Sequence, residues 1–248
     1  MTTFRDHFSE SSAGYARFRP RYPDALFRWV AEHSPGRQRV WDCATGTGQA
    51  AVGLAEHFDL VIGTDASSAQ LAHAPRARGI VYVRSTAEAS GLRSASVDAV
   101  VVAQAVHWFD IAAFFAEARR VVRPGGLVAV WTYGNPSVDP AIDAVVAPFY
   151  RDVVGPYWPP ERRMIERLYQ DIEVPFTPVP VPDMPLRMSM TLEALAGYIG
   201  TWSAVQRYRE ATGADPMPAL AGALAAVWGD PRQPRSTSWP LAVKAGRV

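Results

Sequence analysis

The sequence predicts an α/β fold built on a doubly wound, mostly parallel β-sheet. Three observations predict it. In the first half of the chain, short apolar segments alternate with helix-like segments, as in repeated βα units. One of these segments, residues 98–103, is apolar after its first residue, which is typical of a strand covered on both faces. Between the first strand and the first helix of the series lies a glycine-containing turn.

The elements of the first half follow from the spacing of apolar residues. Strands are expected at residues 39–42, 60–64, 80–83, 98–103 and 127–131. Helices are expected at residues 49–58 and 111–122, with a further helix that Ser67 or Ser68 caps and that ends near Pro75. The turn Pro124-Gly125-Gly126 ends the last helix and starts the fifth strand.

The second half has a different composition. Residues 136–185 are rich in proline and aromatic residues, and the prolines after residue 174 indicate an extended edge strand or a bent connector. A helix is expected over residues 191–209 and a last strand over residues 239–245. We therefore expect one domain over residues 1–248: a core at about 13–135, a helical lid or insertion at about 136–208, and edge strands at about 209–248.

Charge and cysteine content exclude several classes of function. Lys+Arg 25 against Asp+Glu 24 gives a net charge of +1, so there is no broad electrostatic reason to bind nucleic acid or an anionic membrane. Cys43 is the single cysteine, which favours a reducing compartment. The chain shows neither a secretory signal nor an apolar run of the ~20 residues that span a bilayer. We expect a cytoplasmic protein without nucleic-acid or membrane partners.

Two kinds of site are not expected. The five histidines are far apart and no C-x-x-C or H-x-x-x-H spacing exists, so no metal site is predicted. The nucleophile elbow G-x-S-x-G of many hydrolases is also missing from the sequence.

The strongest functional signal is the turn that follows the first strand, Asp42-Cys43-Ala44-Thr45-Gly46-Thr47-Gly48. Small residues there let a ligand lie against backbone amides. Asp42 ends the strand, where its carboxylate can accept hydrogen bonds from a ligand ammonium group or order the loop. Asp65 ends the next strand, 19 residues after Gly46, where its two oxygens can accept hydrogen bonds from both hydroxyls of a ribose.

More than one ligand fits this turn. Residues 46–51 also match the G-x-G-x-x-A pattern of nicotinamide-cofactor enzymes, and Asp65 suits NAD as well. However, Asp42 would repel a pyrophosphate, whereas S-adenosylmethionine has no phosphate and carries an ammonium group that a carboxylate attracts. A purely structural turn is the third interpretation.

An ordered series of motifs resembles that of class I, Rossmann-like S-adenosylmethionine-dependent methyltransferases: residues 42–48, Asp65, Ala87-Glu88 and Arg123-Pro124-Gly125-Gly126. The resemblance covers about residues 13–131 and implies a seven-stranded sheet. It is closest to the methyltransferase type 11 subgroup that includes trans-aconitate methyltransferase and similar small-molecule enzymes. One departure is Ala44, where many members have glycine; a methyl group is tolerated there if the local φ is negative.

The resemblance implies a role for each matching position. The methionyl part of the cofactor would be framed by four turn residues, Ala44, Thr45, Gly46 and Gly48. Asp65 would bind the ribose, Ala66 would pack on the adenine, and Ala87 and Glu88 would hold the adenine edge, although Glu88 is equally interpreted as a solvated loop carboxylate. Gln104 would lie near the sulfonium. Tyr15 and Arg19 would pair with the cofactor carboxylate, the alternative being the exposed start of a surface helix.

His107 is the candidate catalytic residue. It follows the fourth strand at the carboxyl edge of the sheet, where ligands bind in this architecture. It is a general base, a substrate-orienting donor or a packing residue. A carboxylate acceptor needs no base; a hydroxyl, amine or carbon acceptor makes His107 the leading candidate for one.

The expected function is transfer of a methyl group from S-adenosylmethionine to a small-molecule acceptor by direct SN2 displacement, with a carboxylate or a hydroxyl as candidate acceptor groups. The alternatives are a non-catalytic cofactor-binding or partner-activating module and an NAD-dependent oxidoreductase. The lid is expected to select the acceptor through an aromatic wall of Tyr198, Trp158 and Trp202. Four arginines of the lid either meet an acidic acceptor or form an exposed helix face: Arg151, Arg162, Arg163 and Arg167. The sequence identifies neither the acceptor nor the oligomeric state.

Overall fold

Seven strands form one sheet in the computed structural model, which describes residues 18–248, and their order is β3-β2-β1-β4-β5-β9-β6. The five strands β1 to β5 pair in parallel, and β9 runs antiparallel to both β5 and β6. The predicted doubly wound, mostly parallel seven-stranded sheet is confirmed. The strands are β1 Arg39–Cys43, β2 Leu60–Asp65, β3 Ile80–Arg84, β4 Val97–Ala103, β5 Val122–Tyr133, β6 Thr177–Pro178 and β9 Leu241–Arg247.

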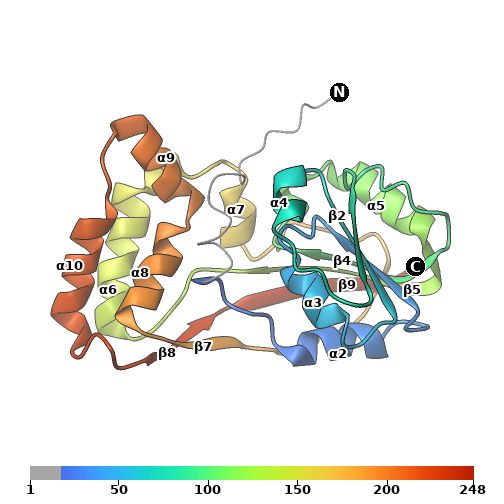
Figure 1. Cartoon of the computed structure of the whole chain (residues 1–248), viewed down its shortest axis with the longest axis horizontal. Coiled ribbons are helices and arrows are strands. Elements are labelled where there is room, and N and C mark those ends of the chain that lie inside the picture. The colour runs from blue at the N-terminus through green and yellow to red at the C-terminus, as the bar shows by residue number, and fades with distance from the viewer. Residues whose placement is uncertain (1–17) are drawn as a thin grey trace.

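Helices cover both faces of the sheet, which explains why β4 is apolar along its length. Helices α2 (Asp24–Glu32) and α3 (Gln49–Leu54) lie on one face and α5 (Ile111–Val121) lies on the other (Figure 1). Ala99 and Val101 belong to the core beneath α2 and α3, whereas Val100 and Val102 belong to the core beneath α5. Successive side chains of a strand point to opposite faces, so each must be apolar when both faces are buried.

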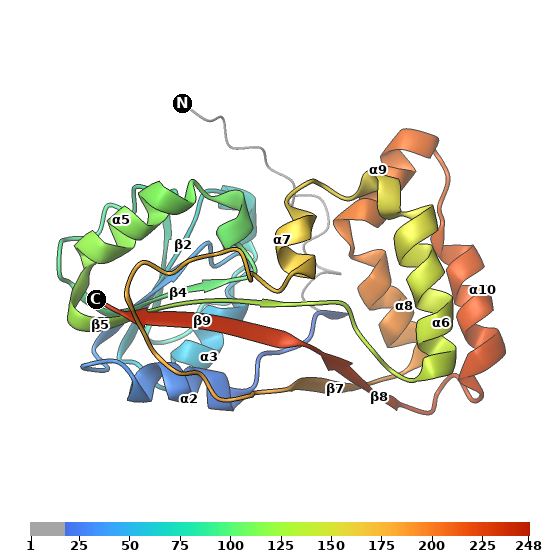
Figure 2. The same ribbon diagram turned by 180° about the vertical axis from the view of Figure 1, so that it is seen from behind.

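A second group of helices lies beyond the end at which β5 leaves the sheet, with α7 (Arg162–Glu166) between this group and the sheet (Figures 1 and 2). A small antiparallel sheet of β7 (Leu186–Met190) and β8 (Arg235–Trp239) connects to it. No helix in residues 18–248 is both long and apolar enough to span a membrane. The helices of this group, here called the lid, are α6 Pro140–Pro148, α8 Leu192–Gly200, α9 Ser203–Thr212 and α10 Met217–Trp228.

The C-terminal half differs from the sequence expectation in three ways. The helix expected over residues 191–209 is two helices, because Trp202 is extended (φ −67°, ψ 135°) and buries its ring at the break between α8 and α9. The strand expected over residues 239–245 is divided by Pro240 into the last residue of β8 and the first five residues of β9. Helix α10 precedes these strands, in a segment where only edge strands were expected, and β9 is interior because β6 pairs with its outer side.

Some boundaries in the first half also shift. Helix α3 ends at Leu54 rather than at residue 58, and α4 (Ser68–Ala72) begins at the expected cap, where the Ser67 hydroxyl accepts a hydrogen bond from the Gln70 amide. The fifth strand begins at Val122, so the expected Pro124-Gly125-Gly126 turn is an irregularity within β5, between the residues that pair with Val97 and Ala99.

A buried carboxylate fixes the start of the sheet. The side chain of Asp98 in β4 is 1% exposed. Its Oδ1 accepts a hydrogen bond from Nη1 of Arg123 at 2.6 Å, and its Oδ2 accepts one from the amide of Arg39 at 2.8 Å. The three strands β1, β4 and β5 are thereby held in register by one side chain. A Cβ on Gly36 would lie 2.9 Å from Oδ1, so a residue without a side chain is needed where the chain approaches this carboxylate.

We predict that Asp98→Asn lowers the free energy of unfolding by about 2 to 3 kcal/mol, because two hydrogen bonds to a charged acceptor are weakened and one amide donor is buried without an acceptor. Urea denaturation followed by circular dichroism measures this change. The matched control is Asp171→Asn, which removes an ion pair to Arg167 on the surface and is expected to cost less than about 0.5 kcal/mol. Equal effects of the two substitutions would contradict the assigned role of Asp98.

Candidate active site

The turn predicted to bind the ligand is tied to the neighbouring strand by hydrogen bonds. The amide of Thr45 donates to the carbonyl oxygen of Thr64 at 2.8 Å, and the amide of Gly46 donates to Oδ2 of Asp65 at 2.9 Å. The hydroxyl of Thr45 donates to Oδ2 of Asp42 at 2.5 Å. The structure therefore brings the two predicted acidic residues to one loop, at the carboxyl ends of β1 and β2.

Two glycines of the turn are required for different reasons. Gly48 has φ +80°, and a Cβ there would lie 2.3 Å from the hydroxyl oxygen of Tyr82 on β3, so packing as well as conformation excludes a side chain. Gly46 has φ +57°, and among residues 18–248 a Cβ there would meet only Oε1 of Gln70, at 3.9 Å. The described residues therefore leave space beside Gly46, as a loop that lies against a ligand requires.

Ala44 corrects one expectation. The methyl group at this position was expected to be tolerated if the local φ is negative, but φ is +54°, in the left-handed region that favours glycine. The turn has left-handed residues at positions 44, 46 and 48, and Ala44 adopts this conformation although it carries a methyl group. Ala44 therefore stores backbone strain at the site, as residues in sparsely populated conformations often do.

Asp65 uses both of its oxygens to order the backbone around it. Oδ1 accepts a hydrogen bond from the amide of Ser67 at 2.8 Å, while Oδ2 accepts the one from Gly46. Ala66 follows directly, and its carbonyl oxygen accepts a hydrogen bond from Nε of Arg84 at 3.1 Å, which fixes the chain as it leaves β2.

Asp42 is fully buried, and its Oδ1 has no hydrogen-bond partner among residues 18–248. The pKa of its carboxyl group is raised from 3.8 to about 7, mainly by burial and also by the nearby charge of Asp65, while the hydrogen bond from Thr45 opposes the rise. A cation placed beside this group would stabilise its ionised form. The orphaned oxygen and the open space at Gly46 fit a ligand with an ammonium group and without phosphate.

Ala87 and Glu88 lie near the same edge of the sheet. Ala87 is buried in the core beneath α5, in a cluster that also holds Cys43 of β1. Oε1 of Glu88 accepts a hydrogen bond from the amide of Asp110, the N-cap residue of α5, at 3.2 Å. Glu88 is therefore more than a solvated loop carboxylate, since it ties the segment after β3 to the start of α5.

Gln104, which follows β4, adopts a left-handed conformation with φ +56°. Its amide donates to the carbonyl oxygen of Trp131 at 2.9 Å. Its side-chain Nε2 donates to the carbonyl oxygen of Tyr133 at 3.3 Å, and its Oε1 accepts a hydrogen bond from the hydroxyl of Thr132. Contacts to the end of β5 thus hold Gln104 in a conformation that is costly for a residue with a side chain.

His107 lies in the 3-10 helix η1 (Val106–Trp108) and is 8% exposed. Its Nδ1 is 2.7 Å from the hydroxyl oxygen of Tyr169, which follows α7 and is itself buried. The pKa of His107 is lowered from 6.5 to about 3, mainly by burial and also by the charge of Arg162. At neutral pH the imidazole is therefore uncharged. Sequence reasoning missed Tyr169, since it is one of many aromatic residues in the second half of the chain and no local pattern singles it out.

Arg19 connects the core to the lid. Its Nη1 donates to the hydroxyl oxygen of Tyr133 at the end of β5, at 3.1 Å, and its Nη2 lies 3.5 Å from the carbonyl oxygen of Thr201 at the end of α8. The guanidinium carbon is 5.4 Å from the centre of the Tyr198 ring. The structure thus places Arg19 at the edge of the sheet where the other predicted residues gather. Tyr15 lies outside the described residues.

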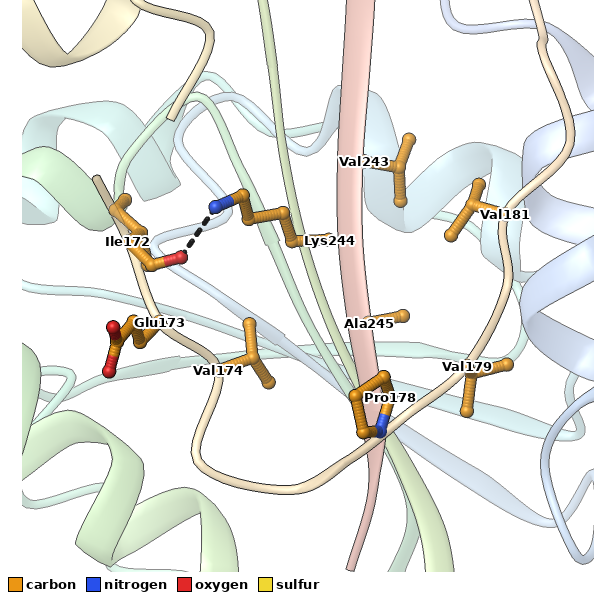
Figure 3. A pocket seen from close by; sticks show the side chains of 9 residues that line it. All are labelled: Ile172, Glu173, Val174, Pro178, Val179, Val181, Val243, Lys244 and Ala245. Carbon is orange, nitrogen blue, oxygen red and sulfur yellow. Dashed lines mark hydrogen bonds between the residues drawn. The ribbon is translucent and has the colours of Figure 1, made fainter. Parts of the chain in front are cut away.

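One hollow lies away from the predicted site residues. A hollow of about 540 Å³ opens between β9 and the connector that leads to β7, and apolar side chains such as Val179 and Val243 line it (Figure 3). The ammonium group of Lys244 in this hollow donates to the carbonyl oxygens of Gln170 and Ile172. None of the predicted site residues lines it. The same part of the chain contains no group of three His, Cys, Asp or Glu side chains arranged to hold a metal ion.

Comparison with known proteins gives matches over most of the chain. A family model described as a methyltransferase domain matches residues 41–130. A protein of Dictyostelium discoideum named as a methyltransferase is 34% identical over 223 residues, which are 88% of this chain and 85% of that protein. A solved structure from Anaeromyxobacter dehalogenans, described as a type II methyltransferase, is 46% identical with a TM-score of 0.87, and the match covers 93% of this chain and 98% of that one.

The chain belongs to the class I S-adenosylmethionine-dependent methyltransferases. This membership decides against the nicotinamide-dependent alternative. A Saccharomyces cerevisiae relative whose name specifies an S-adenosylmethionine-dependent methyltransferase is 33% identical over 134 residues, about half of each chain. The resemblance to the trans-aconitate methyltransferase subgroup stays a prediction, as do the roles of the individual site residues in this methyltransferase.

Backbone strain at Ala44 gives a prediction about stability. Ala44→Gly is expected to leave the free energy of unfolding unchanged or to raise it by up to about 1 kcal/mol, because relief of the left-handed strain offsets the extra entropy of glycine in the unfolded chain. The control is Ala116→Gly in the exposed middle of α5, which is expected to cost about 1 kcal/mol. Chemical denaturation of both variants measures the difference. A loss at position 44 as large as that at position 116 would show that the backbone there is not strained.

The buried imidazole gives a prediction about pH. Because folding lowers the pKa of His107 from 6.5 to about 3, the unfolded chain takes up a proton between these values that the folded chain does not. The contribution of His107 to stability is therefore complete above pH 6.5 and is lost as pH falls towards 3, at about 1.4 kcal/mol per pH unit. Denaturation at pH 6.5 and pH 5 should show the wild-type protein losing about 2 kcal/mol more than His107→Gln.

The titration of Asp42 changes the free energy of unfolding in the opposite direction. The wild-type protein and His107→Gln share this contribution. The pKa of Asp42 is raised to about 7, so the stability that it contributes is present below pH 3.8 and is lost as pH rises through 7. Subtracting the pH profile of His107→Gln from that of the wild-type protein removes this contribution. Identical profiles for the two proteins would mean that His107 titrates normally in the folded chain.

Proposed function

We propose that this methyltransferase transfers the methyl group of S-adenosylmethionine to a small-molecule acceptor by direct SN2 displacement. The observation that carries the proposal is the pair of carboxylates around the left-handed turn: Asp42, whose buried Oδ1 has no hydrogen-bond partner among residues 18–248, and Asp65, which orders the backbone of both neighbouring loops. Together they provide negative potential and hydrogen-bond acceptors for a nucleoside that carries positive charge, and they disfavour a pyrophosphate.

In this proposal, different residues contact different parts of the cofactor. Ala44, Thr45, Gly46 and Gly48 present backbone to its methionyl part, and Asp65 accepts hydrogen bonds from the ribose hydroxyls. The adenine lies between Ala66 on one side and the Ala87-Glu88 segment on the other. Gln104 and Arg19 meet the methionyl end, where the guanidinium of Arg19 suits a carboxylate. In support of these assignments, the turn residues, Asp65, the Ala87-Glu88 segment and Gln104 come at the end of β1, β2, β3 and β4 or shortly after it, and Arg19 contacts the end of β5.

The bound cofactor supplies a methyl group that its sulfonium already activates, so the chain mainly has to orient the acceptor. Alignment of two reactants is worth about 7 to 11 kcal/mol of barrier, which leaves little need for acid–base residues. His107 suits this role. Since its pKa is lowered to about 3, the imidazole is uncharged and a weak base at neutral pH. Its hydrogen bond with Tyr169 holds the ring in one orientation. We assign His107 to orienting the acceptor rather than to general-base catalysis.

The lid is the part of the chain that selects the acceptor in this proposal. Aromatic residues in and beside it pack on one another: the rings of Trp158 and Trp202 are tilted by 49° with centres 5.7 Å apart, and those of Tyr198 and Trp202 are nearly perpendicular with centres 6.1 Å apart. The lone cysteine, Cys43, is buried and unpaired, which suits action on a small molecule in the reducing cytoplasm. A non-catalytic cofactor-binding module would have the same cofactor contacts but no turnover.

Isothermal titration with S-adenosylhomocysteine tests the cofactor site. Asp65→Asn is expected to weaken binding ten- to a hundredfold, since hydrogen bonds to a charged acceptor contribute about 1.5 to 3 kcal/mol. The control is Asp59→Asn, an exposed carboxylate just before β2, which should leave the affinity unchanged. NADH should give no heat of binding.

Two results would decide against the proposal. Unchanged affinity in Asp65→Asn would place the cofactor elsewhere, and tight NADH binding without a response to S-adenosylhomocysteine would favour an oxidoreductase. Turnover is measured separately with S-adenosylmethionine labelled in its methyl group and a panel of small acids, phenols and amines. Binding without methylation of any acceptor in that panel would favour the non-catalytic module.

A further inference from the structure

The carboxyl group of Asp42 is enclosed beside the turn that would hold the cofactor. Asp42 is 0% exposed, and the hydroxyl of Thr45 donates to its Oδ2 at 2.5 Å. Its Oδ1 is buried as well and has no hydrogen-bond partner within residues 18–248. The space that the described residues leave open lies beside Gly46, on the same turn. A ligand in that space acts on Asp42 through its electric field, because the enclosed carboxyl group offers no surface for contact.

The strands beside Asp42 bring no positive charge to it. In the pairing register its neighbours are Gly63 of β2 and Val101 of β4, which carry no charge. Cys43, the next residue of β1, is buried, and burial raises the pKa of its thiol, so the thiol is uncharged. Tyr82 of β3 also keeps its proton, since burial and the charge of Asp42 raise the pKa of its hydroxyl to about 12. Asp42 is therefore without a cationic partner among the residues that the structure describes.

A second carboxylate is tied to the same turn. The hydroxyl of Thr45 donates to Asp42, and the next amide along the chain, that of Gly46, donates to a carboxylate as well. This second acceptor is Oδ2 of Asp65, at 2.9 Å. Two carboxylates held by adjacent residues repel each other when both are ionised, and burial removes the water that would screen them. Only the Thr45 hydroxyl and the amide of Ala51, in the first turn of α3, favour the ionised form of Asp42.

The neutral form of Asp42 is therefore the stable one below neutral pH when no cation is present. A buried carboxylate without a cationic partner is costly, so such a group keeps its proton at a pH at which an exposed carboxyl group is ionised. The pKa of Asp42, raised from 3.8 to about 7 mainly by burial, agrees with this reasoning. At pH 6.5 most of the protein carries a proton on this group.

The methionyl end of the cofactor supplies the missing cation. S-adenosylmethionine and S-adenosylhomocysteine both carry an ammonium group at that end. The energy between two charges falls only in inverse proportion to their distance and is large where water is excluded, so an ammonium group beside Gly46 favours ionised Asp42 without touching it. Binding of the ligand and loss of the proton from Asp42 are therefore coupled, and each favours the other.

We propose that the cofactor's ammonium group exchanges for the proton of Asp42: binding at the turn expels this proton to the solvent, and the ionised carboxylate then attracts the ammonium group across the turn. Asp42 is thereby the residue that selects a nucleoside with an amino-acid end over one without it. The charge of the buried region stays balanced, because one positive charge leaves as another arrives. This inference rests on the proposed function, since it concerns the same cofactor site.

The exchange makes the affinity for the cofactor depend on pH. Below pH 7 the protein must give up a proton when the cofactor binds, so the affinity falls by up to about tenfold for each pH unit. S-adenosylhomocysteine is therefore expected to bind about tenfold more weakly at pH 6 than at pH 8. An uncharged nucleoside that fits the same space is expected to show no such dependence.

Isothermal titration at pH 6.5 counts the protons. Wild-type protein is titrated with S-adenosylhomocysteine in imidazole and in phosphate, two buffers with different heats of protonation, and the difference between the observed heats gives the number of protons released. We expect about three quarters of a proton per ligand bound, which is the fraction of Asp42 protonated at this pH. The matched ligand is 5′-methylthioadenosine, which has the adenosine and the thioether but no ammonium group, and it should release none.

Two variants assign the proton to Asp42. Asp42→Asn keeps an oxygen for the Thr45 hydroxyl but cannot ionise, so it should release no proton and bind S-adenosylhomocysteine equally at pH 6 and pH 8. At pH 8 its affinity for this ligand should be at least tenfold below that of the wild-type protein, whereas unchanged affinity for 5′-methylthioadenosine shows that it is folded. Asp59→Asn, a change at an exposed carboxylate, should release as many protons as the wild-type protein.

The outcomes separate this inference from the proposed function. Wild-type protein that binds S-adenosylhomocysteine without releasing a proton, or that releases as many protons with 5′-methylthioadenosine, overturns the inference alone. So does an Asp42→Asn variant that releases protons as the wild-type protein does. The titrations of the wild-type protein decide the question even if Asp42→Asn does not fold. Wild-type protein that binds no S-adenosylhomocysteine at either pH overturns the proposed function instead.

Discussion

The carboxylate of Asp65 is the constraint on which the rest of the site depends. By accepting hydrogen bonds from the amides of Gly46 and Ser67, it joins the loop after β1 to the loop after β2 and fixes the distance between them. The strained conformations in the first loop persist because such contacts over-determine them. A ligand that bonds to this carboxylate meets a site whose ordering has already taken place during folding, so little binding energy is lost in arranging the loop.

The parts of the site that the sequence predicted are those that lie at the ends of strands. Asp42, Asp65 and Gln104 each end or follow an apolar segment, and the carboxyl ends of parallel strands meet at one edge of a sheet, so local pattern alone gathers them. The continuous apolar character of β4 likewise predicted a strand with two covered faces, and its residues alternate between two cores. Apolar periodicity and the order of strands along the chain predict these features without knowledge of any contact between distant residues.

What the sequence left open depends on contacts between distant residues. The hydrogen bond between His107 and Tyr169 joins residues 62 positions apart, and Arg162 is distinguished from its exposed neighbours only by the fold of the connector around it. The positive φ of Ala44 has a similar cause. The loop is fixed by hydrogen bonds from Thr45 and Gly46 to residues at the end of β2, which lie about 20 positions further along the chain. Trp202 breaks a segment whose apolar spacing suits one continuous helix, since burying its ring stabilises the bend more than helix propensity opposes it.

Negative and positive side chains lie in different parts of this region, and this separation favours different ligands in each part. Carboxylates at Asp42 and Asp65 lie at the ends of β1 and β2, whereas the guanidinium of Arg162 lies beyond β4 and β5, with the uncharged His107 and Tyr169 beside it. A cationic ligand is attracted to the first region and repelled by the second, and an anionic ligand has the reverse preference. Because buried neutral groups keep the local dielectric low near Arg162, the discrimination there is stronger than it would be between the same charges in water. The same fold thus presents charges of opposite sign near the ends of neighbouring strands.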